Sequence, residues 1–381
     1  MHNKNPAMQP SHMVEVLREL KTNLAANFSH YEEAPFDRGK WKQLGELGVH
    51  GWPIPEKYGG SGWDASHICR GLEVLGEYCE DGGLAFAVAA QMLSCTIPIV
   101  KYGSSEQKEK LLPGICSGDI IIANSITEPE SGSDVYDMDS RAILDKKGNY
   151  HLNGEKIMIT SGPIADYHLV YMATDHEKGY FGGITAFLVD NSLDGVNAEV
   201  TLSKMGLDTA QMGQQFFNNV CVSEDYILGE VGGGGPIFNK SMEWERGLLG
   251  AIHIGTMGRI LNQIIKYTKA RKVGGQSISK YQSIAHKLSD MKVRYETGKL
   301  LLYAASESMD TSDAGMMSSI AKLQVSESLQ ASCLDALQIM GGRGYLKDSP
   351  FERYVRDALS ATIYSGTSEV QRSIIARYLG L

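Results

Sequence analysis

One stretch of this chain carries residue types that could hold a cofactor. ANSITEPESGSD, at 123–134, offers the hydroxyls of Thr127 and Ser133, and Gly132 leaves its backbone open to close approach. Pro129 stiffens the same turn. Surface loops often have this composition, so the stretch alone indicates a cofactor loop without deciding for it.

A second stretch, MEWERG, carries carboxylates that could do acid–base chemistry. Glu243 and Glu245 stand two residues apart and are followed by Arg246. Residues two apart on a helix point about 200° from one another, so the two glutamates cannot serve the same site. A carboxylate in a dry site can accept a proton because burial raises its pKa, whereas a glutamate on a solvated helix face would only add charge.

Three segments with different apolar patterns must position these residues. The first, 1–118, has helical spacing, as in HMVEVLRELKTNL, and is predicted to be an N-terminal helical domain. The second, 119–230, alternates as strands do and is predicted to be a middle β domain. The third, 231–381, follows a run of four glycines and contains three long helical patterns, which predict a C-terminal helical bundle.

Particular elements can be predicted inside these segments. LAFAVAAQMLSCTIPIV, at 84–100, is short for a membrane span and contains polar residues, so we expect a buried helix. In NYHLNGEKIMIT, Asn153 and Gly154 predict a hairpin turn between two strands. PIFNKSMEWERGLLGAIHIGTMGRILNQIIKYTKARK could form one helix of unusual length.

Composition excludes several classes of function. The net charge of −9 argues against non-specific binding to nucleic acid. The six cysteines form no C-x-x-C pair, so neither a zinc site nor a redox pair is expected. No G-x-G-x-x-G follows a strand, which gives no support to a Rossmann nicotinamide site. The polar start MHNKNPAMQPSH lacks the apolar core of a signal peptide, and we expect a cytoplasmic protein.

Several short motifs, in matching order and spacing, resemble those of the acyl-CoA dehydrogenase family from one end of the chain to the other. The match also extends to family members that act on carrier proteins in natural-product pathways. The motifs are EKYGGSG (56–62), TEPESGSD (127–134), NGEKIMITSG (153–162), WERG (244–247), ARKVGG (270–275), LQIMGGRGY (337–345) and RDALSATIYSGTSEVQRSIIARYL (356–379).

The resemblance implies a mainly α fold with a β-barrel or β-sandwich middle domain, a C-terminal four-helix bundle, bound FAD and a homotetramer. It places Thr160 near flavin N5 and brings Arg271 from a neighbouring subunit to the pyrophosphate, where a guanidinium fork suits a diphosphate. The flavin contacts that it implies are Asn124, Ser125, Ile126, Thr127, Ser133, Met158, Ile159, Thr160, Arg271, Gln338, Gly341, Gly342, Gly366, Thr367 and Glu369.

The sequence departs from the family pattern at three positions. Met158 stands where Trp or Phe is usual beside the flavin, and Gly274 replaces a common Phe in the segment that reaches the neighbouring subunit. Ser365 follows Tyr364 where most members have the catalytic glutamate. A serine hydroxyl is a far weaker base than a carboxylate, so the base must lie elsewhere.

The family offers a second location for the base. Its isovaleryl and long-chain members carry the glutamate on the first long helix of the C-terminal domain, just before an arginine. Glu245 and Arg246 match that arrangement, so we expect Glu245 to take the proton α to a thioester carbonyl. Ser133, Arg246 and Tyr364 are then expected to contact the substrate.

Other functions stay open at this point. A flavin monooxygenase on the same fold, acting on an amine or related small substrate, would also lack the usual glutamate. A binding protein without a base is a further alternative. The acyl carrier could be CoA or a carrier protein, and the electron acceptor could be an electron-transfer flavoprotein or O₂.

Overall fold

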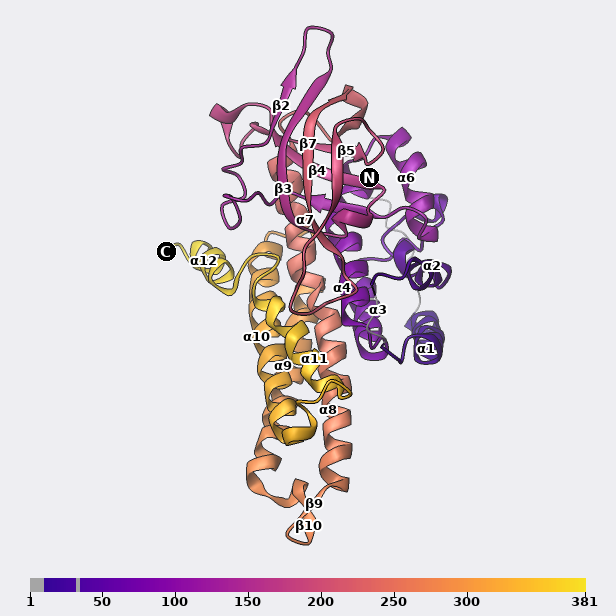
Figure 1. Ribbon diagram of the computed structural model, residues 1–381, viewed down its shortest axis with the longest axis vertical. Helices are drawn as coiled ribbons and strands as arrows, with labels where there is room; N and C mark the ends of the chain where they lie inside the picture. Colours follow the sequence, from indigo (N-terminus) through magenta and orange to yellow (C-terminus); the bar gives the residue numbers. More distant parts are fainter. Residues whose placement is uncertain (1–9, 32–34) are drawn as a thin grey trace.

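The computed structural model describes residues 10–31 and 35–381. Its N-terminal part is helical, as the apolar spacing predicts, and lies along one side of the molecule (Figure 1). The elements are α1 (Pro10–Asn27), α2 (Arg38–Glu46), α3 (Ala65–Tyr78), α4 (Gly82–Gln91), α5 (Ile97–Tyr102) and α6 (Ser105–Ser117).

Helices α4 and α5 are joined by a wide π turn, Met92–Thr96, so that the chain runs as one helical stretch over Gly82–Tyr102. By length and composition this stretch could cross a membrane, but 89% of the relevant window is buried inside the protein. Burial of this kind is typical of a core helix, as predicted for 84–100.

The middle part is one eight-stranded sheet in which the strands follow the order β6-β7-β3-β2-β4-β5-β8, and β1 pairs with β4 in parallel. The segment predicted to be β from its alternating pattern contains all of these strands. The strands are β1 (Ile122–Ser125), β2 (Arg141–Leu144), β3 (Tyr150–Thr160), β4 (Tyr167–Ala173), β5 (Ile184–Asp190), β6 (Val196–Thr201), β7 (Met212–Val222) and β8 (Ile227–Leu228).

The predicted hairpin turn at Asn153 and Gly154 is wrong. Strand β3 runs straight through both residues, and the chain instead reverses between β2 and β3. The pairing of β3 with β7 shifts register at this point, which marks a bulge. A Cβ atom on Gly154 would lie 2.1 Å from Ser140 Oγ, so the glycine permits a close approach rather than a turn.

The C-terminal part is a bundle of long antiparallel helices (Figure 1). The long helix expected after the glycine run is divided at Leu249 into α7 and α8. A short two-stranded ribbon, β9 (Lys272–Val273) with β10 (Gln276–Ser277), turns the chain at the far end of the bundle. The helices are α7 (Gly234–Leu248), α8 (Gly250–Ala270), α9 (Gln282–Glu307), α10 (Ala314–Met340), α11 (Pro350–Leu359) and α12 (Ser368–Tyr378).

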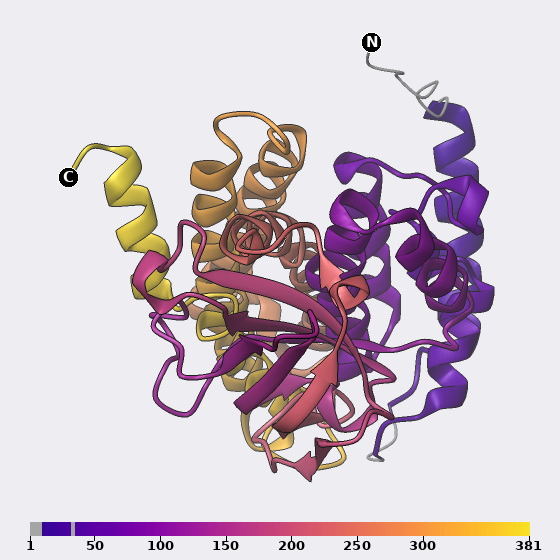
Figure 2. The ribbon, with the colours of Figure 1, turned by 90° about the horizontal axis from the view of Figure 1, so that it is seen from above.

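The N-terminal helices and the bundle share one continuous apolar core. Helices α3 and α8 cross with their backbones in contact: a Cβ on Gly76 would lie 2.0 Å from Ile252 O, and one on Gly255 would lie 2.1 Å from Glu73 O. Seen from above, the two groups of helices lie side by side with the sheet across them (Figure 2). Helix α7 therefore runs where all three parts meet.

Candidate active site

The candidate base, Glu245, lies inside the protein on α7. Its side chain is 8% exposed, and the hydroxyl of Ser365 donates a hydrogen bond to its Oε1. Glu243 points elsewhere and pairs with Lys240 at 2.9 Å. The structure thus separates the two glutamates as helical geometry requires, and it brings Glu245 together with the serine that replaces the usual base.

The backbone around Ser365 is held from three sides. Ser365 and Gly366 both adopt positive φ, at 56° and 87°. Arg246 Nε donates to Ser365 O at 3.1 Å, and Lys322 Nζ donates to Gly366 O at 2.7 Å. Gln371 Nε2 donates to both carbonyls, at 3.1 and 2.8 Å. We call residues 365–366 the serine turn.

The charge state of Glu245 reflects two opposed influences. Burial raises its pKa, while the Ser365 hydrogen bond, the charge of Arg246, the Ser94 hydroxyl and the charge of Lys322 lower it. Ser94 reaches Glu245 from the π turn, a distortion that often marks functional sites. The carboxylate is therefore dry yet surrounded by groups that favour its ionised form, as a proton acceptor requires.

Tyr364 forms one wall of the site. Its hydroxyl lies 2.6 Å from His253 Nε2, and its ring packs against Phe86 with centroids 4.7 Å apart. Burial lowers the pKa of His253 to about 3 and raises that of Tyr364. The tyrosine therefore keeps its proton and donates a hydrogen bond to a neutral imidazole. Tyr364 is thereby fixed in orientation beside Glu245.

The loop that follows β1 is anchored by a buried ion pair. Lys156 Nζ lies 2.6 Å from Glu128 Oε1 and also donates to Ile126 O at 3.2 Å. The backbone N–H of Ile157 donates to Thr127 O at 2.9 Å. The Glu128 carboxylate in turn accepts the backbone N–H groups of residues 139 and 140. The T-E-P-x-x-G-S-D stretch is thus tied along β3.

The residues on either side of this loop fit a flavin. Within the described ranges, Asn124 Oδ1 and Ser125 Oγ are buried and have no hydrogen-bond partner, and the same is true of Ser368 Oγ at the start of α12. Met158 is 53% exposed on β3 with φ of 57°. Thr367 caps α12, whose first backbone N–H groups form a natural anion site. Polar atoms without partners and an exposed apolar side chain suit a large cofactor with polar and aromatic faces.

Four of the residues expected to contact the flavin lie far in space from the loop that follows β1. Lys322 touches Gly366, and α10 continues for 18 residues beyond it to Met340, which is ~27 Å at 1.5 Å per residue. Gln338, Gly341 and Gly342 lie at that distant end, and Arg271 adjoins β9 at the opposite end of the molecule from the sheet (Figure 1). One chain does not bring these four to the loop that follows β1, residues 126–134, which we call the flavin loop.

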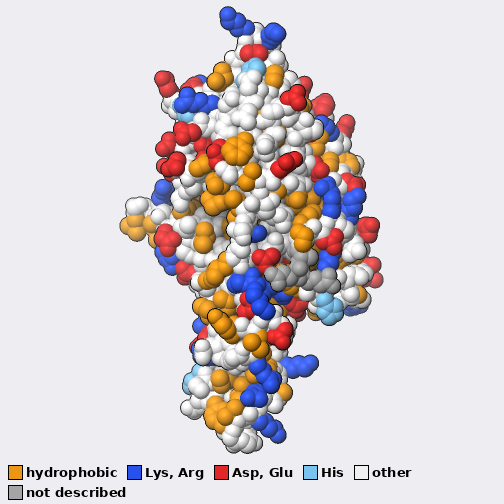
Figure 3. Space-filling view, in the orientation of Figure 1, with side chains coloured by type: hydrophobic (Ala, Val, Ile, Leu, Met, Phe, Trp, Pro, Cys, Tyr) orange, Lys and Arg blue, Asp and Glu red, His pale blue; other side chains and the backbone are white. Residues whose placement is uncertain are grey.

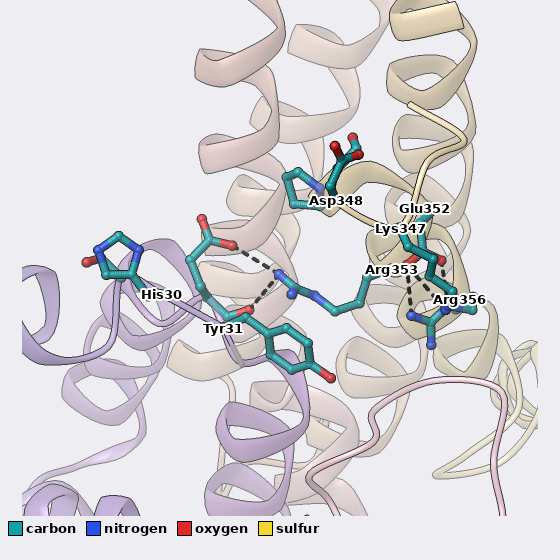
Figure 4. Close-up of a pocket in the computed structure, with 11 residues that line it drawn as sticks. His30, Tyr31, Lys347, Asp348, Glu352, Arg353 and Arg356 are labelled. Carbon is teal, nitrogen blue, oxygen red and sulfur yellow. Dashed lines mark hydrogen bonds and ion pairs between the residues drawn. The ribbon is translucent and has the colours of Figure 1, made fainter. Parts of the chain in front are cut away.

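A surface cavity of about 430 Å³ is not this site. It lies between the end of α1 and α11, and its charged groups pair with one another (Figure 4). Arg353 approaches Glu80 and stacks on Tyr31 at 3.7 Å, while Arg356 pairs with Glu352. These contacts join the N-terminal helices to the bundle, and we assign the cavity no role in catalysis.

Three family models match consecutive parts of the chain: the N-terminal, middle and C-terminal domains of acyl-CoA dehydrogenase, at residues 13–119, 123–220 and 232–380. The chain belongs to the acyl-CoA dehydrogenase family. The fold predicted from the motifs is thereby confirmed, and so is the class of enzyme, a FAD-dependent oxidoreductase acting on CH–CH groups.

Individual relatives sharpen the comparison. An L-prolyl-[peptidyl-carrier protein] dehydrogenase of Pseudomonas fluorescens is 38% identical over 374 residues, covering 98% of each chain. The crystal structure of the prolyl acyl carrier protein oxidase AnaB is 39% identical, with a TM-score of 0.94 over 98% of this chain and 100% of that one. A structure of PigA with FAD and proline is 32% identical, with a TM-score of 0.94 over the full length of both.

Several residues of this acyl-CoA dehydrogenase site were not predicted from its sequence: Ser94, His253, Lys322, Gln371 and the Glu128–Lys156 pair. Only Lys322 left a usable signal. It shares a helix face with buried residues at positions 318, 325 and 329, where a lysine is out of place unless it has a partner inside. The others contact residues distant in sequence and follow no local pattern.

Proposed function

We propose that this enzyme removes the α proton of an acyl thioester with Glu245 while the β hydride leaves for the flavin. Bound FAD supplies the hydride acceptor. Glu245 takes the proton, Ser365 orients its carboxylate, and Tyr364 forms a wall of the site beside it. One observation carries the proposal: a buried carboxylate at the alternative family position is hydrogen-bonded by the serine that stands at the usual one.

We further propose that the acyl group is tethered to a carrier protein. The support is the length and extent of the match to the prolyl carrier-protein enzymes. Ser133 is exposed on the flavin loop, where a pantetheine arm could pass inwards towards Arg246 and Tyr364. A small acyl group such as prolyl would fit behind the arm, because Phe86 packs against Tyr364 and narrows the site.

The flavin site requires a second copy of the chain under this proposal. Thr127, Met158, Thr160 and the residues at 366–369 come from one copy, and Arg271, Gln338, Gly341 and Gly342 come from another. The bundle exposes apolar side chains suited to such contacts, namely Val293, Leu300, Leu334, Tyr345 and Leu346, and apolar side chains gather over its face in Figure 3. We propose a homotetramer in the cytoplasm, with an electron-transfer flavoprotein or O₂ as electron acceptor.

The flavin monooxygenase alternative gains nothing from the site. Hydroxylation of an amine needs no carboxylate against the α carbon of a thioester, whereas Glu245 is kept dry and accepts a hydrogen bond from Ser365. Two of the relatives compared above are a dehydrogenase and an oxidase.

The test is anaerobic flavin reduction by prolyl-carrier protein and by the matching prolyl-CoA. Glu245→Gln keeps the size of the side chain and removes the carboxylate, so reduction should slow by at least ~10²-fold with FAD still bound. Glu243→Gln, two residues away on the same helix, should stay near wild type and is the matched control.

The two parts of the proposal fail separately. Wild-type reduction rates in Glu245→Gln would disprove the assignment of the base. Equal or faster turnover of the CoA thioester would disprove the carrier protein and leave the base untouched.

A further inference from the structure

We propose that Lys322 is a positioning residue for the base: it holds the serine turn so that the Ser365 hydroxyl stays on Glu245. The inference rests on the proposed role of Glu245 and adds to it a residue that acts on the base through the serine turn. The connection runs from Lys322 Nζ to Gly366 O, through the turn to Ser365 Oγ, and from there to Glu245 Oε1.

The placement of Lys322 is costly and calls for a reason. Its side chain is 6% exposed on α10, and no carboxylate among the described residues lies within 4.0 Å of its ammonium group. A buried cation without an ion-pair partner is unfavourable unless other polar groups compensate for it. Its one hydrogen bond in the structure goes to Gly366 O, so the compensation is concentrated on the serine turn.

The serine turn depends on outside support. A non-glycine residue at φ of 56° is uncommon, and Ser365 adopts this conformation beside a glycine that does the same. Arg246, Lys322 and Gln371 fix both carbonyls of the turn from three different helices, α7, α10 and α12. Removing one donor would let the turn relax and carry the hydroxyl away from the carboxylate.

A hydroxyl needs this support more than a carboxylate would. Its single hydrogen bond is directional and weakens steeply when the angle or distance changes. When the Ser365 bond is lost, Glu245 keeps the burial that raises its pKa and loses the first of the contacts that oppose it. Both the aim of the base and the fraction in the ionised form would fall.

Charged and titratable groups face Lys322 from α7, α8, α10 and α12. Glu245 and Arg246 face it from α7, His253 from α8, Glu369 from α12 and Glu327 from its own helix. Burial and the charge of Arg246 lower the pKa of Lys322 to about 8, so it carries a positive charge around neutral pH.

The experiment compares Lys322→Met, Ser365→Ala and the double variant by anaerobic flavin reduction across pH. Lys322→Met should slow reduction by about 10-fold or more, because small displacements of a catalytic group are expensive. The acid limb, the low-pH side of the plot of reduction rate against pH, should move to higher pH in Lys322→Met and also in Ser365→Ala. The rate of the double variant should lie within about threefold of the rate of the slower single variant, because both substitutions act through the same contact. Lys322→Arg keeps a charged donor and should recover most of the rate.

The controls separate positioning from general damage. Lys292→Met removes an exposed lysine on α9 and should leave rate and pH profile unchanged. FAD content and melting temperature report folding. If Lys322→Met does not fold, Gln371→Met removes another donor to the same carbonyls and should move the acid limb in the same direction.

Two results would overturn the inference. One is rate losses that multiply in the double variant, and the other is an acid limb that stays in place in Lys322→Met or in Gln371→Met. Either result beside a slow Glu245→Gln would refute Lys322 alone, whereas a fast Glu245→Gln would refute the base itself.

Discussion

Two buried lysines hold the two sides of the site, and they do so differently. Lys156 donates to Ile126 O in the flavin loop at 3.2 Å, and Lys322 donates to Gly366 O in the serine turn at 2.7 Å. Lys156 also has a carboxylate partner, Glu128, at 2.6 Å. Lys322 has no such partner within ion-pair distance in the part of the chain that the structure describes.

The difference separates a structural contact from a functional one. The Lys156–Glu128 pair is closed on itself, because Glu128 also accepts two backbone N–H groups and its pKa is lowered in spite of burial. Little of its charge is left to act at a distance. Lys322 is not neutralised in this way, so its charge acts on the nearby Glu245. We therefore expect loss of stability on one side and loss of rate on the other.

The largest expected effect is on the closed pair. Lys156→Met strands Glu128 in a buried position, and the free energy of unfolding should fall by about 3–5 kcal/mol, with weakened FAD binding. Chemical denaturation and FAD content measure both. Adding Glu128→Gln neutralises the stranded charge while keeping its acceptor, and should restore part of the loss. A loss below about 1 kcal/mol would show that the pair does not anchor the loop.

A smaller effect on stability is expected at Lys322, which has no ion-pair partner among the described residues. Lys322→Met strands no contacting carboxylate, and Gln371 still donates to Gly366 O. The free energy of unfolding should fall by about 1 kcal/mol, the typical net contribution of one hydrogen bond. The same denaturation series measures it. A loss as large as that of Lys156→Met would remove the contrast between the two lysines.

The smallest effect concerns pH and the cost of keeping the base dry. The pKa of Glu245 is raised in the folded state, so its carboxylate opposes folding above that pKa and ceases to do so when protonated. Glu245→Gln should therefore raise the unfolding free energy by up to about 1 kcal/mol at pH 8, in line with gains at functional residues. The gain should vanish towards pH 4.5, which paired melting curves at the two pH values would show.

Local patterns predicted much of the fold, and the family resemblance supplied the candidate for the base. Alternating and helical spacing located most strands and helices, and the pairing of Glu245 with Arg246 identified a carboxylate that the structure buries. The hairpin turn predicted at Asn153–Gly154 is wrong because the same dipeptide suits either a turn or a close approach between strands. The neighbouring Ser140, which is distant in the local pattern, shows that it is a close approach.

What the sequence could not supply was the set of contacts that hold the site. Lys322 meets Gly366 across 44 positions, and Tyr364 meets His253 across 111. Such contacts depend on how helices pack, and no periodicity within one helix encodes its neighbour. The residues at 338–342 that the family resemblance assigns to the flavin could be named by motif, but their separation from 366–369 appears only when α10 is seen to be one continuous helix.

The π turn at Met92–Thr96 has a consequence for the stretch that contains it. One extra residue in a helical turn changes the phase of everything that follows by about 100°. Before the turn, Leu84 and Phe86 pack into the core shared with the bundle, whereas Cys95 within the turn and Ile99 after it pack into the core beneath the sheet. A single continuous helical stretch thus contributes side chains to both cores. Its length in residues is therefore fixed as firmly as its composition, because deleting one residue would turn half of the stretch away from its partner.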